Sequence, residues 1–109
     1  MTVNELLLSG KLEAISLPDG QREIDGVYIG DLLSWVMGNA QADNVWITIM
    51  SNINVVAVAS LADVACVVLA EGVTLEENIR ETALNKGVNV LKTSMSAYET
   101  ALWLGQELK

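Results

Sequence analysis

The stretch at 45–72 reads VWITIMSNINVVAVASLADVACVVLAEG, and it decides the fold. Two strongly apolar runs, at 45–50 and 64–69, lie on either side of a short polar break and a segment rich in Ala and Val. Neither run alternates between apolar and polar residues, which is typical of strands buried on both faces of a parallel sheet. Parallel strands need a crossover, so we predict a helix at 53–61, although the Val residues of that segment favour a strand.

Signals for further helices lie on both sides of this stretch. Three capping boxes, each a Ser or Thr followed three residues later by Glu, predict that helices begin at Thr2, Thr74 and Ser96. The helix after Thr74 is expected to end at Gly87, because glycine suits a left-handed C-terminal cap. Asp31 is predicted to be the N-cap of another helix that runs to about residue 40.

Shorter apolar segments at 12–16, 27–29 and 88–91 are predicted to be additional strands. From residue 45 onward, the order of strand, helix, strand, helix, strand and helix requires right-handed crossovers and a parallel sheet. We therefore expect residues 1–109 to form a single α/β domain with a mainly parallel sheet flanked by helices. A chain of 109 residues can bury a core without a metal or a disulfide.

The chain is unusually apolar, with 51% hydrophobic residues and a mean hydropathy of +0.38. Its longest uncharged stretch, at 44–62, contains Ser51, Asn52 and Asn54 and is too polar and too short to span a membrane. The first residues, MTVNELLLSGKLE, have no basic region ahead of the apolar ones, so a secretory signal is not expected. We expect a cytoplasmic protein that does not contact a membrane.

The charge balance argues against nucleic acid as a partner. Fourteen acidic and 6 basic residues give a formal net charge of −8. The basic residues are scattered singly along the chain, and they are Lys11, Arg22, Arg80, Lys86, Lys92 and Lys109. Such a surface would repel a phosphate backbone.

The usual catalytic groups are missing from the sequence. The chain has no His, no CxxC pair and no clustered carboxylates at metal-ligand spacing, so neither a metal nor a cofactor is expected. The single cysteine, Cys66, lies within the apolar segment VACVVLA and is predicted to be a buried, inert thiol. No GxxxxGK[ST] phosphate-binding loop is present, so we expect no kinase activity and no other enzymatic activity.

Three segments of the chain resemble a stand-alone DRTGG domain, a family related to the N-terminal domain of HPr kinase/phosphorylase. They read GDLLSWVMGNA at 30–40, WITIMSNINVVAVASLADVACVVLAEG at 46–72 and TSMSAYETALWL at 93–104. Similar domains occur in some phosphotransacetylases and in some CBS-domain inorganic pyrophosphatases. The resemblance implies a regulatory or architectural domain without catalysis of its own.

The letters that name the family are only partly kept. The Asp-Arg pair expected after the first central strand stands here as Ser51 and Asn52. The Thr-Gly-Gly expected after the next strand stands as Ala70, Glu71 and Gly72, so that only the last glycine is retained.

Small polar residues follow both central strands, and they form the candidate ligand site. The carboxyl ends of adjacent parallel strands border a crevice, where such groups and free helix N-terminal amides can hold a ligand. The same residues are also ordinary turn and capping residues, and the basic features that accompany phosphate binding are missing. The candidate residues are Ser51, Asn52, Asn54, Glu71, Gly72 and Thr74.

The C-terminal helix carries the candidate subunit interface. On a helical wheel, its core stripe consists of Ala97, Ala101, Leu104 and Leu108. Leu102 and Trp103 project beyond this stripe, which predicts that they lie in a homodimer interface.

Two functions remain open from the sequence. The first is a non-catalytic regulatory or interaction domain, a homo-oligomer that binds or regulates a metabolic or redox enzyme. The second is a sensor for a small molecule, possibly a nucleotide, that binds in the crevice at the carboxyl ends of the central strands.

Overall fold

The two apolar runs form the centre of the sheet, as predicted. β3 (Val45–Thr48) and β4 (Cys66–Leu69) are buried along their whole length and pair in parallel, with Val45 opposite Cys66. The segment between them is α3 (Ile53–Ala62), so the predicted crossover helix is confirmed. The computed structural model describes residues 1–108.

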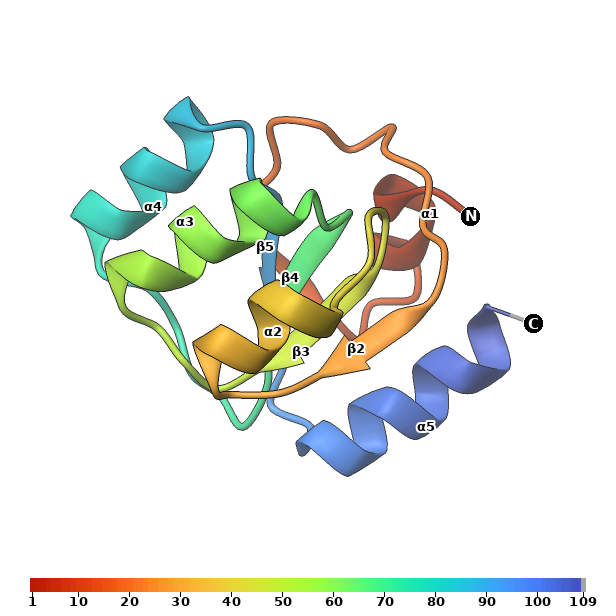
Figure 1. Cartoon of the computed structure of the whole chain (residues 1–109). Coiled ribbons are helices and arrows are strands. Elements are labelled where there is room, and N and C mark those ends of the chain that lie inside the picture. Colours follow the sequence, from red (N-terminus) through yellow and green to blue (C-terminus); the bar gives the residue numbers. More distant parts are fainter. Residues whose placement is uncertain (109) are drawn as a thin grey trace.

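Five strands make up the sheet, in the order β1-β5-β4-β3-β2 (Figure 1). β2 (Val27–Ile29) pairs in parallel with β3, and β5 (Val90–Lys92) pairs in parallel with β4. β1 (Glu13–Ser16) is the exception, because it runs antiparallel to β5 at one edge of the sheet. The predicted α/β fold with a mainly parallel sheet is therefore confirmed.

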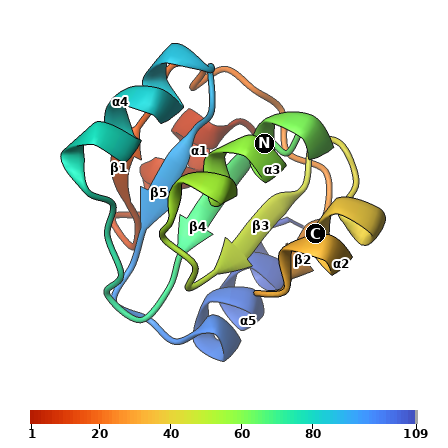
Figure 2. The same ribbon diagram turned by 60° about the vertical axis from the view of Figure 1, so that its left-hand side comes forward.

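Helices cover both faces of the sheet (Figure 2). α2 (Leu33–Asn39), α3 and α4 (Glu77–Asn85) lie on one face, where they pack around the buried Trp46. α1 (Val3–Leu7) and α5 (Ala97–Glu107) lie on the other face. None of the helices within residues 1–108 is long and apolar enough to cross a membrane.

Two side chains of the central strands that carry a possible hydrogen-bond donor, Trp46 and Cys66, are out of contact with solvent. Trp46 is 0% exposed, and its indole Nε1 donates a hydrogen bond of 2.9 Å to the backbone oxygen of Gly30. Cys66 is also fully buried, and this burial raises the pKa of its thiol to about 12. A thiol in this environment stays protonated at physiological pH, so it is a poor nucleophile.

Two of the three predicted capping boxes form. The backbone N–H of Glu5 donates to Thr2 Oγ1, and that of Glu99 donates to Ser96 Oγ, each at 3.1 Å. The box predicted at Thr74 is wrong, because α4 begins three residues later at Glu77, without a side-chain cap. The chain between β4 and α4 instead forms a turn at 71–72 and has no regular structure at 73–76, and Thr74 lines a cavity there.

Asp31 does not cap α2, so this prediction is also wrong. α2 begins at Leu33, and its N-cap position is held by Leu32, which has no capping side chain. Asp31 Oδ1 accepts hydrogen bonds from the Thr48 hydroxyl at 2.8 Å and from the Ile49 backbone N–H at 3.0 Å. The Asp31 carboxylate therefore ties the β2–α2 turn to the carboxyl end of β3.

The prediction that Trp103 lies on the outer face of α5 is wrong. The Trp103 side chain is only 9% exposed and packs in the core with Leu104, while its Nε1 donates a hydrogen bond of 3.1 Å to Glu107 Oε1. Leu102 is 54% exposed, as predicted. The buried stripe is rotated toward Trp103 because a tryptophan ring removes far more apolar area from water than the alanines of the predicted stripe.

Arg22 joins the loops at the amino end of the sheet. Its Nη2 atom lies 2.7 Å from Asp43 Oδ1 and 3.0 Å from Asp63 Oδ1. Partial burial alone would lower the pKa of Arg22, but its hydrogen bonds to both carboxylates outweigh that effect and raise it. One of the few basic groups of the chain is therefore committed to holding two aspartates.

Candidate functional site

Two cavities lie at the carboxyl end of the parallel strands. The first, here named the strand-end crevice, has a volume of about 530 Å³ and lies where α3 and α4 begin. The second, here named the lysine pocket, has a volume of about 310 Å³. Both are within or close to the size range of small-ligand sites.

The strand-end crevice brings together part of the predicted ligand site. Ser51 and Asn52 come from the turn after β3, and Thr74 comes from the segment after β4. These three predicted residues line one cavity, as the parallel pairing of the strands implied. Its other lining residues were not predicted, and they are Ile53, Glu76, Asn78 and Ile79.

The other three predicted residues do not line this crevice. Asn54 lies in the first turn of α3, where its backbone N–H donates to Asn52 Oδ1 at 2.9 Å. Glu71 lines neither cavity, and Gly72 lines the lysine pocket. Whether any of the six residues binds a ligand stays a prediction.

The path of the chain after β4 explains why Glu71 and Gly72 do not line the strand-end crevice. The backbone N–H of Glu71 donates to Met95 O, and that of Gly72 donates to Thr93 O, both at 2.9 Å. Both residues adopt left-handed backbone conformations, with φ values of 60° and 75°. For Glu71 this conformation costs about 1 kcal/mol or more, whereas Gly72 adopts it without a Cβ clash. These contacts hold the start of the loop against the chain after β5, away from the strand-end crevice.

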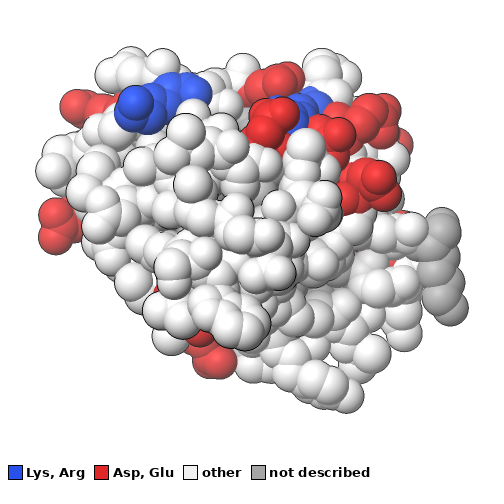
Figure 3. Space-filling model, viewed as in Figure 1, with Lys and Arg blue, Asp and Glu red and all other residues white. Residues whose placement is uncertain are grey.

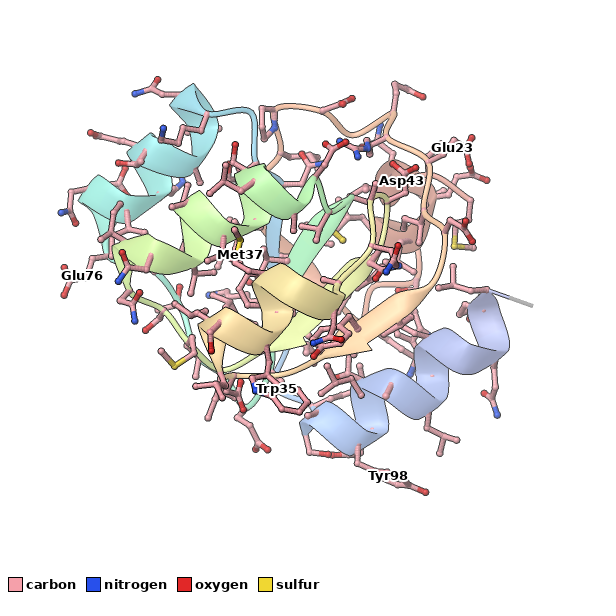
Figure 4. The ribbon with its side chains drawn as sticks, in the orientation of Figure 1. Glu23, Trp35, Met37, Asp43, Glu76 and Tyr98 are labelled. Carbon is pink, nitrogen blue, oxygen red and sulfur yellow. The ribbon has the colours of Figure 1, made fainter. Side chains whose placement is uncertain are left out.

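The chemistry of the strand-end crevice is neutral and polar. A hydroxyl and an amide line it from the α3 side, and a second hydroxyl and the Asn78 amide line it from the α4 side. Its one charged lining group is the Glu76 carboxylate, which projects at the start of α4 (Figure 4). The lining groups suit hydrogen bonding to an uncharged polar ligand or to the base of a nucleotide better than binding of a bare anion. Glu76 and Asn78 were missed because both were assigned to the predicted helix after Thr74. In the structure Glu76 is the N-cap of α4 and Asn78 lies in its first turn, and both line the crevice.

The lysine pocket is built from segments far apart in the sequence. β1 runs antiparallel to β5, so Glu13 at the start of β1 lies opposite Lys92 at the end of β5. The residues that precede Glu13 therefore meet the residues that follow β5. The pocket is lined by Lys11, Glu13, Gly72, Lys92, Thr93 and Ser94, among others. Because the two lysines are isolated in the sequence, only the pairing of the edge strand could have shown that they meet.

Of the three helices that cover one face of the sheet, α2 and α3 carry no charged side chain. α2 and α3 pack side by side, and neither contains Asp, Glu, Lys or Arg. Figure 3 shows the surface over them as white, with the charged groups mostly along its upper edge. Several large apolar side chains of these helices and their flanking turns are exposed, namely Leu32, Trp35, Met37, Ile53 and Leu61. We name this surface the uncharged face.

Comparison with known proteins connects this geometry to a family. The family model described as DRTGG domain matches residues 18–106. A similar solved structure contains the CBS and DRTGG domains of the regulatory region of Clostridium perfringens pyrophosphatase, complexed with the activator diadenosine tetraphosphate. It shares 14% sequence identity with this chain at a TM-score of 0.71, over 92% of this chain and 44% of that one. Among the curated proteins, none matches this sequence.

Proposed function

The chain belongs to the DRTGG domain family, and on this basis we propose that it is a non-catalytic regulatory domain that forms a homodimer and binds a metabolic or redox enzyme. The similar domain of the Clostridium perfringens pyrophosphatase lies in the regulatory region of an enzyme, which supports the regulatory role. This chain spans less than half of that structure, at 44%. The sequence also contains no phosphate-binding loop that would support phosphoryl transfer.

The observation that carries this proposal is the uncharged face. Each copy of the chain has a net charge of −8, so bringing two copies together at charged surfaces would place like charges side by side. The surface over α2 and α3 avoids this repulsion because these helices contain no charged residue. It also offers apolar side chains, whose removal from water would favour association. We therefore place the second copy on the uncharged face.

Trp35 is the expected centre of this interface. Its side chain is 65% exposed, and it projects from α2 on the side away from α3 (Figure 4). Leu32 beside it is 62% exposed, and Leu61 on α3 is 72% exposed. Exposed tryptophans frequently supply a large share of the binding free energy in interfaces. Trp103, the tryptophan chosen from the sequence, is buried within its own subunit and is replaced by Trp35 in this role.

Substitution of Trp35 tests the dimer. We expect the wild-type chain to sediment as a dimer at micromolar concentration and Trp35→Glu to sediment as a monomer with an unchanged circular dichroism spectrum. The introduced carboxylate would be desolvated in the interface and would face its own copy across a twofold axis. Leu102→Glu is the matched control, because this exposed residue lies on α5 and should leave the dimer intact. A monomeric wild-type protein would contradict the proposal, and dissociation by Leu102→Glu alone would move the interface to α5.

A nucleotide sensor is the second candidate function, and the strand-end crevice is the observation that favours it. Its volume of about 530 Å³ and its hydroxyl and amide lining suit a nucleoside-sized ligand. The solved structure with the similar domain holds diadenosine tetraphosphate as an activator. On this reading, Ser51, Asn52 and Thr74 contact the ligand directly, while Asn54, Glu71 and Gly72 shape the loops around it.

Thermal unfolding with adenine and guanine nucleotides, with and without magnesium, tests the sensor function. We expect a nucleotide to raise the melting temperature, since a ligand at a hundredfold excess over its Kd stabilises the folded state by about 2.7 kcal/mol. Thr74→Val should abolish the rise because it removes a hydroxyl from the crevice without removing a helix cap. Asn54→Ala is the control, since Asn54 does not line the crevice. The sensor function is wrong if no nucleotide shifts the melting temperature, or if both variants respond alike.

A further inference from the structure

We propose that the lysine pocket is a binding site for a phosphate group, either free phosphate or the phosphate of a small phosphorylated molecule. The site is separate from the strand-end crevice and from the uncharged face. It depends on the edge pairing of β1 with β5, which brings Lys11 and Lys92 to one cavity from positions far apart in the sequence.

The first argument is the use of positive charge in an acidic protein. The chain has only 6 basic residues, and the two arginines are committed to structural contacts. Arg22 holds Asp43 and Asp63, while Arg80 binds Glu77 and donates from Nε to the backbone oxygen of Ile15. Of the three lysines within residues 1–108, two line the same small cavity. That placement gives a local excess of positive charge on a surface that is otherwise strongly negative.

The second argument is how weakly these two lysines are neutralised. Within residues 1–108, no carboxylate lies within ion-pair distance of Lys11. Lys92 Nζ lies 3.7 Å from Glu13 Oε2, which is longer than a direct charge-assisted hydrogen bond. Glu13 is 77% exposed, so its carboxylate can turn into solvent when an anion enters. Two cations against one displaceable carboxylate favour a ligand that carries more than one negative charge.

The third argument is the supply of neutral hydrogen-bond donors beside the lysines. The Thr93 side chain is nearly buried, at 6% exposed, and its Oγ1 accepts a hydrogen bond of 3.2 Å from the backbone N–H of Met95. Because this contact uses the oxygen as an acceptor, the hydroxyl proton remains available to a ligand. Ser94 lines the same pocket with a second hydroxyl.

The shape of the pocket agrees with a small anion. Gly72 lines it with no side chain, and a Cβ at that position would meet no atom within 4 Å, so the space in front of the backbone is open. A volume of about 310 Å³ is at the lower limit for small-molecule sites. Phosphate carries close to two negative charges near neutral pH and accepts several hydrogen bonds. Its charge matches the two lysines, and its oxygens match the two hydroxyls.

The experiment is a nuclear magnetic resonance titration of the folded wild-type chain at constant ionic strength. The probes are inorganic phosphate and glycerol 3-phosphate, which distinguish free phosphate from a phosphate monoester, and succinate, which tests for unspecific binding of dianions. We expect saturable shifts of the amide signals of Lys11, Gly72 and Ser94 with at least one of the phosphates. Succinate should cause much weaker shifts, because it cannot match the tetrahedral arrangement of acceptors.

Three variants make the assignment specific. Lys92→Gln and Lys11→Gln should each weaken phosphate binding about tenfold, the effect of losing one charge-assisted contact. Glu13→Gln should strengthen it by a similar factor, since it removes the competing carboxylate. Lys86→Gln is the matched control, because it makes the same change of net charge at an exposed residue outside the pocket. Lys11 lies outside the strands, so Lys11→Gln should stay folded and testable even if Lys92→Gln disturbs the sheet.

The proposal is overturned if the phosphates cause no saturable shift, or if succinate binds as tightly as they do. It is also overturned if the shifts map to the strand-end crevice, or if Lys86→Gln weakens binding as much as Lys11→Gln. A failure of the homodimer or of nucleotide binding would leave this result unaffected, because neither proposal uses Lys11, Lys92, Thr93 or Ser94.

Discussion

Trp103→Glu is expected to unfold the domain, whereas Leu102→Glu, at the preceding position of the same helix, is expected to leave it folded. Trp103 is 9% exposed and packs against the sheet, while Leu102 is 54% exposed. A carboxylate at the buried position would lose its hydration and would face Glu107, which now accepts a hydrogen bond from the indole. The expected loss is about 4 kcal/mol or more of the 5–15 kcal/mol that stabilise a typical domain.

Chemical denaturation followed by circular dichroism measures this difference. Leu102→Glu should change the free energy of unfolding by about 0.5 kcal/mol or less, as for most surface substitutions. Trp103→Phe is a useful intermediate, because it keeps an aromatic ring but loses the indole hydrogen bond, worth about 1 kcal/mol, and part of the buried ring area. Equal free energies of unfolding for the two glutamate variants would contradict the burial of Trp103 against the sheet.

Trp46→Ala is the second substitution with a large expected effect. The Trp46 side chain is 0% exposed and lies in the core between the sheet and α2, α3 and α4. Its loss would leave a cavity at the centre of the molecule, and it would leave the Gly30 carbonyl without its indole donor. We expect a loss of about 3–5 kcal/mol in the free energy of unfolding.

Trp46→Phe separates these two contributions. Phenylalanine fills most of the volume but cannot donate to Gly30 O, so its cost should be about 1–3 kcal/mol. In urea denaturation, the free energy of unfolding should decrease in the order wild type, Trp46→Phe, Trp46→Ala. If Trp46→Ala retains wild-type stability, the described packing of β3 beneath α2 is incorrect.

The sequence predicted the centre of the fold because burial there leaves a continuous signal. Strands β3 and β4 have no polar alternation, and the need for a crossover between them outweighed the preference of Val for strands in α3. The antiparallel edge strand β1 was recognised as a strand, but its direction was not. The sequence of a four-residue edge strand does not specify which strand it pairs with or in which direction.

Two of the errors in the sequence predictions have a common physical cause. Asp31 was expected to cap a helix, but its carboxylate instead accepts hydrogen bonds from Thr48 and Ile49, at and just after the end of β3. Trp103 was expected outside the core because the helical wheel counted apolar positions without weighing their areas. In both cases, a contact between segments distant in sequence decided the position of a side chain.

The candidate site was predicted only in part, because a local sequence pattern does not show which distant segments meet. The parallel pairing of β3 and β4 was enough to bring Ser51, Asn52 and Thr74 to one crevice. The separation of Gly72 from this group depends on hydrogen bonds to the chain after β5, which no local pattern shows. The meeting of Lys11 and Lys92 likewise depends on the pairing of β1 with β5.

The loop after β4 is a wall of both cavities, and this has a thermodynamic consequence. Gly72 lines the lysine pocket, while Thr74 and Glu76, a few residues further on, line the strand-end crevice. If an anion in the lysine pocket selects one conformation of this loop, it also selects the geometry offered to a ligand in the strand-end crevice. By linkage, each ligand must then change the affinity of the other by the same factor. A single short loop would thus give this domain an allosteric response to two different molecules.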